Sequence, residues 1–271
     1  MTLTPADLAA YRERIGWDGA GGVDRATLET IVLGHALAIP FENLDPLTGI
    51  VPDLTPDALV AKLVRGGRGG YCYEHNGLLK AVLDTLGFGV TGLAARVMWG
   101  ADGVVRGRTH MVLLVDLPGG PAIADVGFGT QTLTGVLDLV DRMAQPTPHG
   151  DFRLVRDGAI WREDACVAGE WRPVYAFDLQ PQLPPDYAIA NWWSATAPGS
   201  HFTTALTATR NLPDRRLALH DFVYAVHVTG GPSERRTLSG PAAVCDLLQS
   251  DFGISLPDRA GLEARLEDIA A

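Results

Sequence analysis

Apolar residues recur at helical spacing through the first third of the chain. A helix is predicted to begin with Thr4 as its N-cap and Pro5 in its first turn, and to end at Gly16. Further segments carry apolar residues three and four positions apart and stop at proline or glycine; they cover residues 24–40, 55–66 and 72–87. We therefore expect a helical bundle over residues 1–88.

The pattern changes after Gly89. Short β-branched and apolar runs now alternate with Gly and Pro, namely GLAARVMW, HMVLLVDL, AIADVGF, FRLVR and PVYAFD. Such runs are typical of an antiparallel barrel or sandwich, and we assign it to residues 89–190.

The last part of the chain mixes both patterns. A Pro-rich connection, QPQLPPDY, precedes strand-like runs at FTTALTAT and FVYAVHV, and the segments PAAVCDLLQS and RAGLEARLEDI are predicted helices. The chain is thus predicted to be an α+β protein whose helical bundle and β domain are followed by a smaller α/β domain over residues 191–271.

Composition and charge exclude several classes of protein. The formal net charge of -10 is spread along 271 residues, so no basic surface is available for nucleic acid. No apolar run could span a bilayer and the N-terminal segment lacks a basic and apolar leader, so we expect a cytoplasmic protein without a membrane partner. Three widely spaced cysteines suit neither disulfides nor zinc, and we expect reduced thiols and no metal.

The most unusual segment is RGGRGGYCYEHN, in which four glycines lead to Cys72 at a predicted helix start. The unpaired N–H groups of a first helical turn stabilise a thiolate and can hold an oxyanion. A Gly-rich cap followed by an inert buried cysteine would give the same pattern. The segment lacks the lysine of a phosphate-binding loop and follows a helix rather than a strand, so a phosphate site is disfavoured.

A nucleophilic cysteine requires a base and a group that orients the base. His110 begins the run HMVLLV, and Asp125 lies among apolar residues before a glycine in the next run. A carboxylate in such surroundings needs a partner, and adjacent strands would let it meet His110. Each of the two taken alone is more often structural, but with Cys72 they predict a Cys-His-Asp triad.

Five motifs in the same order resemble those of the arylamine N-acetyltransferases, over nearly the whole chain. These are IPFENLDP, GRGGYCYEHN, GRTHMVLLV, ADVGFG and NWWSATAPGSHF. The resemblance implies a helical bundle, a β-barrel and an α/β lid around a cysteine-protease-like core. It also implies a ping-pong reaction with acetyl-CoA as acyl-donor substrate, no permanently bound cofactor, and a role in xenobiotic metabolism.

The resemblance also implies roles for individual residues. Cys72 corresponds to the acylated nucleophile, His110 to its proton acceptor and Asp125 to the group that orients the imidazole. The implied coenzyme A contacts are Thr109, Gly129 and Phe202; the implied acceptor contacts are Tyr71, Phe128 and Phe202; Phe41, Glu42 and Asn43 are supporting residues; and Tyr73, Ala195 and Ala197 depart from the family's usual residues.

Several alternatives stay open at this point. An amide synthase of the same fold would close a polyketide chain by attack of its own aromatic amine on a Cys72 thioester. A cysteine hydrolase shares the nucleophile, and a ligand-binding module would have lost turnover. We expect an arylamine or arylhydrazine and acetyl-CoA as small-molecule partners, while the preferred amine and the choice between monomer and homodimer stay open.

Overall fold

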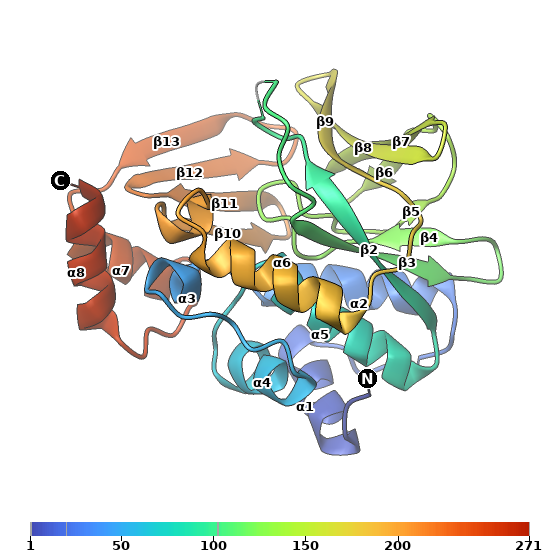
Figure 1. The fold of residues 1–271 in the computed structure, drawn as a ribbon, viewed down its shortest axis with the longest axis horizontal. Helices are drawn as coiled ribbons and strands as arrows, with labels where there is room; N and C mark the ends of the chain where they lie inside the picture. The colour runs from blue at the N-terminus through green and yellow to red at the C-terminus, as the bar shows by residue number, and fades with distance from the viewer. Residues whose placement is uncertain (1, 20, 102, 271) are drawn as a thin grey trace.

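The structure is a computed structural model that describes residues 2–19, 21–101 and 103–270. Its N-terminal part consists of helices joined by short loops (Figure 1). These elements are α1 (Pro5–Ile15), α2 (Arg25–Ala38), α3 (Leu44–Leu47), α4 (Pro56–Leu59), a π-helical turn η1 (Val60–Arg65) and α5 (Cys72–Leu86). The expected helical segments are therefore confirmed, and the four-residue helix α3 is an addition.

The predicted helix ends are confirmed at α1. The Thr4 side chain accepts a hydrogen bond from Asp7 N, and Gly16 adopts a left-handed conformation at φ 67°. The segment after Thr55 behaves differently, because only α4 is α-helical and the chain then widens into η1. This change could not be predicted, because apolar spacing does not distinguish a π-helical turn from an α-helical one.

Eight antiparallel strands form the β domain in the order β5-β4-β3-β2-β9-β8-β7-β6. A bridge between Asp141, which follows β5, and Leu154 of β7 brings the β5 edge of the sheet against the strand next to its other edge, so that the sheet curls into a nearly closed barrel. The strands are β2 (Gly89–Val97), β3 (His110–Asp116), β4 (Ala122–Ala124), β5 (Leu137–Asp138), β6 (Gln145–Thr147), β7 (Gly150–Asp157), β8 (Ile160–Val167) and β9 (Glu170–Phe177). The strand β8 was not predicted, because its charged residues interrupt the apolar pattern.

A second sheet has five strands in the order β1-β10-β11-β12-β13. Its edge strand β1 (Phe41–Glu42) comes from the N-terminal part of the chain and pairs with β10, as Phe41 lies opposite Thr209. The remaining elements are β10 (Thr207–Leu212), β11 (Arg215–His220), β12 (Val223–Val228), β13 (Ser233–Thr237), α7 (Pro241–Ser250) and α8 (Arg259–Ala270). The first half of the run FTTALTAT is not a strand; residues 201–203 form a single 3₁₀ turn.

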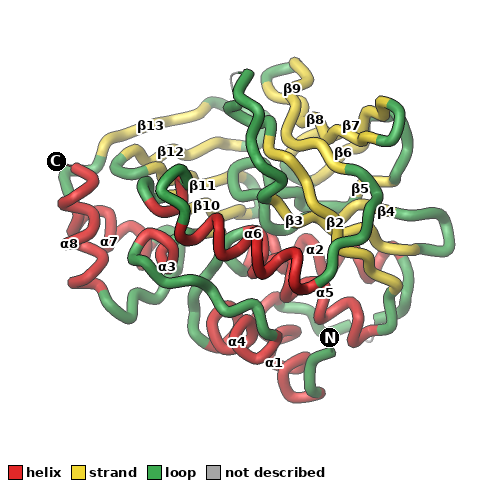
Figure 2. The backbone as a smooth tube through the Cα atoms, in the orientation of Figure 1, coloured by secondary structure: helices red, strands yellow, loops and turns green. Residues whose placement is uncertain are grey.

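A long helix, α6 (Pro184–Thr196), follows the Pro-rich connection and was not predicted. It crosses the front of the molecule between the two sheets and the N-terminal helices (Figure 2). Pro184 and Pro185 occupy its first turn, where no N–H bond is lost, and Asp186 accepts a hydrogen bond from Leu183 N at 2.8 Å. The prolines therefore start a helix here instead of breaking one.

Candidate active site

The Gly-rich segment brings Cys72 to the first position of α5 through a close passage of backbones. A Cβ atom at Gly69 would lie 1.9 Å from the Pro40 carbonyl oxygen, and Gly70 O accepts a hydrogen bond from Glu42 N at 2.8 Å. No other residue fits at Gly69. Cys72 is 3% exposed, and its Sγ lies 3.7 Å from Thr109 O.

His110 and Asp125 meet across the adjacent strands β3 and β4. His110 Nε2 lies 2.6 Å from Asp125 Oδ2, and both side chains are buried. Asp125 Oδ1 accepts two further hydrogen bonds, from Asn76 Nδ2 at 2.8 Å and from Gly127 N at 2.9 Å. Because Asn76 lies one turn after Cys72 on α5, it fixes the barrel carboxylate to the helix of the thiol. Asn76 was missed by sequence reasoning, although it stands inside the Gly-rich motif.

The electrostatics of the pair favour a protonated imidazole. Burial opposes a charge on His110, but the charge and hydrogen bond of Asp125, together with Cys72, raise the pKa of His110 to about 10. Burial likewise opposes ionisation of Asp125, yet His110, Asn76 and Gly127 hold the pKa of this carboxyl below its usual range. Since Nε2 is bound to Asp125, Nδ1 is the ring nitrogen left to interact with the Cys72 thiol.

A pocket opens onto Cys72 and His110. Thr109, Phe128, Gly129 and Phe202, all expected around the substrates, lie in its wall. Its remaining lining residues are Phe41, Val97, Trp99, Arg106, Gly127, Thr130, His201 and Thr207. The wall is mostly apolar and aromatic, and no carboxylate is among the described residues that line it, which suits a planar uncharged ligand.

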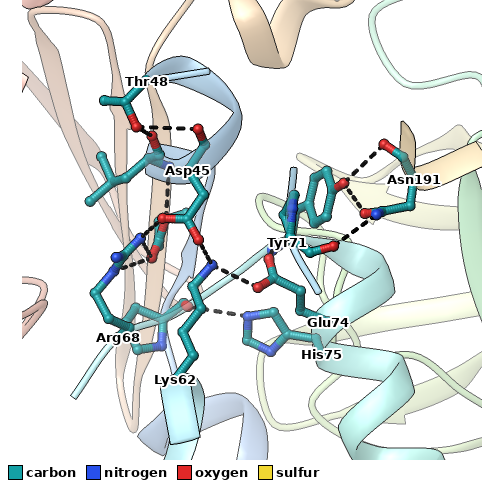
Figure 3. Close-up of polar contacts among 12 residues, drawn as sticks. Asp45, Thr48, Lys62, Arg68, Tyr71, Glu74, His75 and Asn191 are labelled. Atoms are coloured by element: carbon teal, nitrogen blue, oxygen red, sulfur yellow. Dashed lines mark hydrogen bonds and ion pairs between the residues drawn. The ribbon is translucent and has the colours of Figure 1, made fainter. Parts of the chain in front are cut away.

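Tyr71 lies behind this pocket and not in its wall. Its side chain is fully buried, edge-on to Phe202 and Tyr73, and its hydroxyl donates a hydrogen bond to Asn191 of α6 (Figure 3). Asn191 in turn donates to Pro52 O at 3.0 Å. Tyr71 therefore contributes to the packing of α6. Its ring contacts Phe202, which lines the pocket.

An ion-pair cluster near the α5 N-terminus is made of Glu42, Asp45, Lys62, Arg68 and Glu74. All of these except Glu42 are labelled in Figure 3. Lys62 Nζ lies 2.6 Å from both Asp45 Oδ2 and Glu74 Oε1. Arg68 contacts Glu42 at 2.8 Å and Asp45 at 2.7 Å. The cluster joins η1, the Gly-rich segment, β1 and α3, so it holds the loop that presents Cys72.

Glu74 connects this cluster to the helix start. Its Oε2 accepts a hydrogen bond from Tyr71 N at 3.1 Å, which caps α5. Burial, partly offset by Lys62, raises the pKa of Glu74 to about 7. Sequence reasoning singled out Glu42 alone from this cluster. The contacts that define the cluster join residues 42–45 to residues 62–74, and they depend on how these separate segments fold together.

Within the described ranges, no group of three or more His, Cys, Asp or Glu side chains is arranged to hold a metal ion. No helix in these ranges combines the length and apolar character needed to cross a membrane.

Comparison with known proteins identifies the family. A family described as N-acetyltransferase matches residues 24–260. The arylamine N-acetyltransferase of Mycolicibacterium smegmatis is 45% identical over 97% of this chain and 98% of its own, and that of Escherichia coli is 41% identical over 94% and 91%. The Mycobacterium marinum arylamine N-acetyltransferase solved with CoA superposes with a TM-score of 0.93 at 41% identity, over 97% of this chain and 99% of that chain. The chain therefore belongs to the arylamine N-acetyltransferase family.

Proposed function

We propose that the protein transfers an acetyl group from acetyl-CoA to an arylamine or arylhydrazine through a thioester on Cys72. Its relatives are acetyltransferases of arylamines, and one of them was solved with CoA. The observation that carries the residue assignment is the geometry: one pocket exposes the thiol and the imidazole, and Asp125 holds that imidazole at 2.6 Å.

The first half of the reaction acylates the enzyme. The Cys72 thiolate, paired with the His110 imidazolium, attacks the thioester carbonyl of acetyl-CoA. The N–H groups at the start of α5 stabilise the oxyanion that forms. As the bond from carbon to the CoA sulfur breaks, the imidazolium gives its proton to that sulfur, so CoA leaves as a thiol.

The second half transfers the acetyl group to the amine. The amine nitrogen attacks the acetyl carbon and loses a proton to His110, now neutral, while Cys72 leaves as a thiolate. Asp125 keeps the ring in one tautomer and stabilises the imidazolium that forms again. Phe128 and Phe202 in the pocket wall offer aromatic faces to a planar acceptor, and Thr109 and Gly129 are assigned to the acyl donor.

The amide-synthase alternative shares this first chemistry but uses a different acyl donor. The relatives reported above favour the acetyltransferase, since they are named for arylamines and extend over nearly the whole chain. A free nucleophilic thiol operates best in a reducing compartment, and on that ground we propose a cytoplasmic location. A role in xenobiotic metabolism is part of the same proposal.

The test is direct acylation. The protein mixed with acetyl-CoA in the absence of acceptor should gain one acetyl mass increment on the peptide that contains Cys72. Cys166 and Cys245 serve as internal controls, because neither lines the pocket. Addition of an aniline should remove the label and yield the acetanilide. An unlabelled Cys72 peptide under these conditions would refute the proposal.

A further inference from the structure

A second buried carboxyl group lies close to the triad, and the reaction above does not use it. Glu163 of β8 is 0% exposed. Its Oε2 lies 2.5 Å from the hydroxyl oxygen of Tyr175, and its Oε1 has no hydrogen-bonding partner among the described residues. An ionised carboxylate in this position would leave a charged oxygen buried without any donor.

Tyr175 of β9 links this carboxyl to the triad. Its ring packs against His110, with centroids 5.0 Å apart, and against Phe128 at 5.6 Å. Its hydroxyl is hydrogen-bonded to Glu163 and also interacts electrostatically with the Asp125 carboxylate. A phenol has one proton to donate, so it cannot donate to both carboxyl groups at once.

The two carboxyl groups differ in how well a negative charge is solvated. Asp125 accepts hydrogen bonds from Asn76 and Gly127 and faces the His110 imidazole. Within the described part of the chain, the hydrogen-bonding partner of the Glu163 carboxyl is the Tyr175 hydroxyl alone. If one of the two is to stay neutral, the balance of hydrogen bonds selects Glu163.

Among the residues that the structure describes, no cation forms an ion pair with Glu163. The charged groups that act on it from the packed elements are Asp125, His110 and Tyr175 of the neighbouring strands and Asp164 of its own strand. Asp164 is already engaged by Arg153 and Arg162, at 3.0 and 2.6 Å. The positive charge that acts on Glu163 is thus that of His110, which is bound to Asp125.

We propose that Glu163 is a positioning residue of the active site: as an uncharged carboxylic acid it donates its proton to the Tyr175 hydroxyl, which in turn donates to Asp125. The buried hydrogen bonds then all donate in one direction, from Glu163 through Tyr175 to the His110–Asp125 pair. It leaves only a neutral carbonyl oxygen, Oε1, without a partner, which costs far less than an unpartnered anion. This role rests on the proposed function of the triad.

Titration behaviour agrees with this assignment. Burial, together with the charge of Asp125, raises the pKa of Glu163 well above its usual range. The wall of the barrel therefore supplies Asp125 with a hydrogen bond but no second negative charge. That arrangement restrains Asp125 without adding a competing partner for the His110 imidazolium.

The protonation state can be measured in the resting enzyme. Infrared difference spectra between the wild type and Glu163→Gln at neutral pH should show a protonated carboxyl C=O band that the variant lacks. Glu170→Gln is the matched control, since Glu170 has a side chain 74% exposed in the same barrel and should contribute no such band. Carboxylate bands alone in the difference spectrum would overturn the proposal.

Kinetics test the positioning role. Glu163→Gln keeps a neutral donor and should acylate Cys72 at close to the wild-type rate, whereas Glu163→Leu removes the donor and should slow acylation about tenfold with KM for acetyl-CoA unchanged. The Gln variant should also lose any decline of activity at high pH that comes from ionisation of Glu163. Equal rates for the Leu variant and the wild type, or a rise in KM alone, would contradict the role.

The two proposals fail in different ways. The infrared measurement needs no substrate, so an ionised Glu163 refutes the inference even if Cys72 is acetylated normally. Conversely, an unlabelled Cys72 refutes the proposed function whatever the state of Glu163. If Glu163→Leu does not fold, the Gln variant and the spectra still decide the question.

Discussion

Two buried polar clusters border the N-terminus of α5, and they balance their charges in different ways. The ion-pair cluster sets Glu42, Asp45 and Glu74 against Lys62 and Arg68. The triad side, in contrast, sets Asp125 against a histidine, whose charge depends on a proton. The cations of the first cluster are lysine and arginine, whereas the cation of the second is a histidine that can lose its proton.

This difference gives the ion-pair cluster a supporting role and the triad a chemical one. Burial opposes the charges of Lys62 and Arg68, but the neighbouring carboxylates raise the pKa of both groups above the usual range, so the ion-pair cluster keeps its cations and holds the Gly-rich segment in one arrangement. An imidazole can give up its proton and take it back, so the triad can transfer a proton in each half-reaction. The helix that starts with Cys72 is thus anchored on one side and reactive on the other.

The largest expected effect comes from removing the charge on the reactive side. Asp125→Asn should lower the rate of Cys72 acylation about a thousandfold, because the imidazolium loses its anion and the preferred tautomer is no longer enforced. The rate is measured by stopped flow with acetyl-CoA in excess. An acylation rate within tenfold of the wild type would mean that Asp125 only supports the barrel.

The next effect concerns stability on the anchored side. Lys62→Met leaves Asp45 and Glu74 buried with one cation too few, and it should lower the free energy of unfolding by about 3 to 5 kcal/mol. Urea unfolding provides the measurement. As a control, Arg172→Gln breaks an exposed pair with Glu170 and should cost less than about 1 kcal/mol. Similar losses in the two variants would contradict the contrast between buried and exposed pairs.

A smaller effect is expected from the titration of Glu74. Its pKa in the folded protein is about 7 against a model-compound value of 4.5, so the folded state binds the extra proton between these two values. The stability that this proton contributes is present at low pH and is lost as the pH rises through about 7, a decline of about 3 kcal/mol at most.

Glu74→Gln isolates that decline. The Gln side chain can still accept from Tyr71 N but cannot titrate, so the unfolding free energy of the variant should lack the loss that the wild type shows between pH 4.5 and about pH 7. The measured quantity is the difference between the wild type and the variant at each pH. A difference that stays constant across this range would show that Glu74 is ionised throughout.

Local signals explain which elements could be predicted. Thr4, Pro5 and Gly16 act on their own neighbours, and the ends of α1 follow from them directly. The missed helix α6 shows the limit, because the same prolines that suggested a connection sit in a first turn whose cap is supplied by Asp186. The domain boundaries at residues 88 and 190 stay a prediction, and β1 joins the C-terminal sheet from within the first segment.

The sequence by itself determined the helix that starts at Cys72, the two strands that present His110 and Asp125, and the family through its motifs. Only the tertiary structure decided that Asn76, Tyr175 and Glu163 surround these groups and that five charged residues anchor the loop before the thiol. The physical reason is that capping and hydrophobic spacing act between neighbours in the chain, whereas the balance of buried charge depends on which distant side chains share one water-free volume.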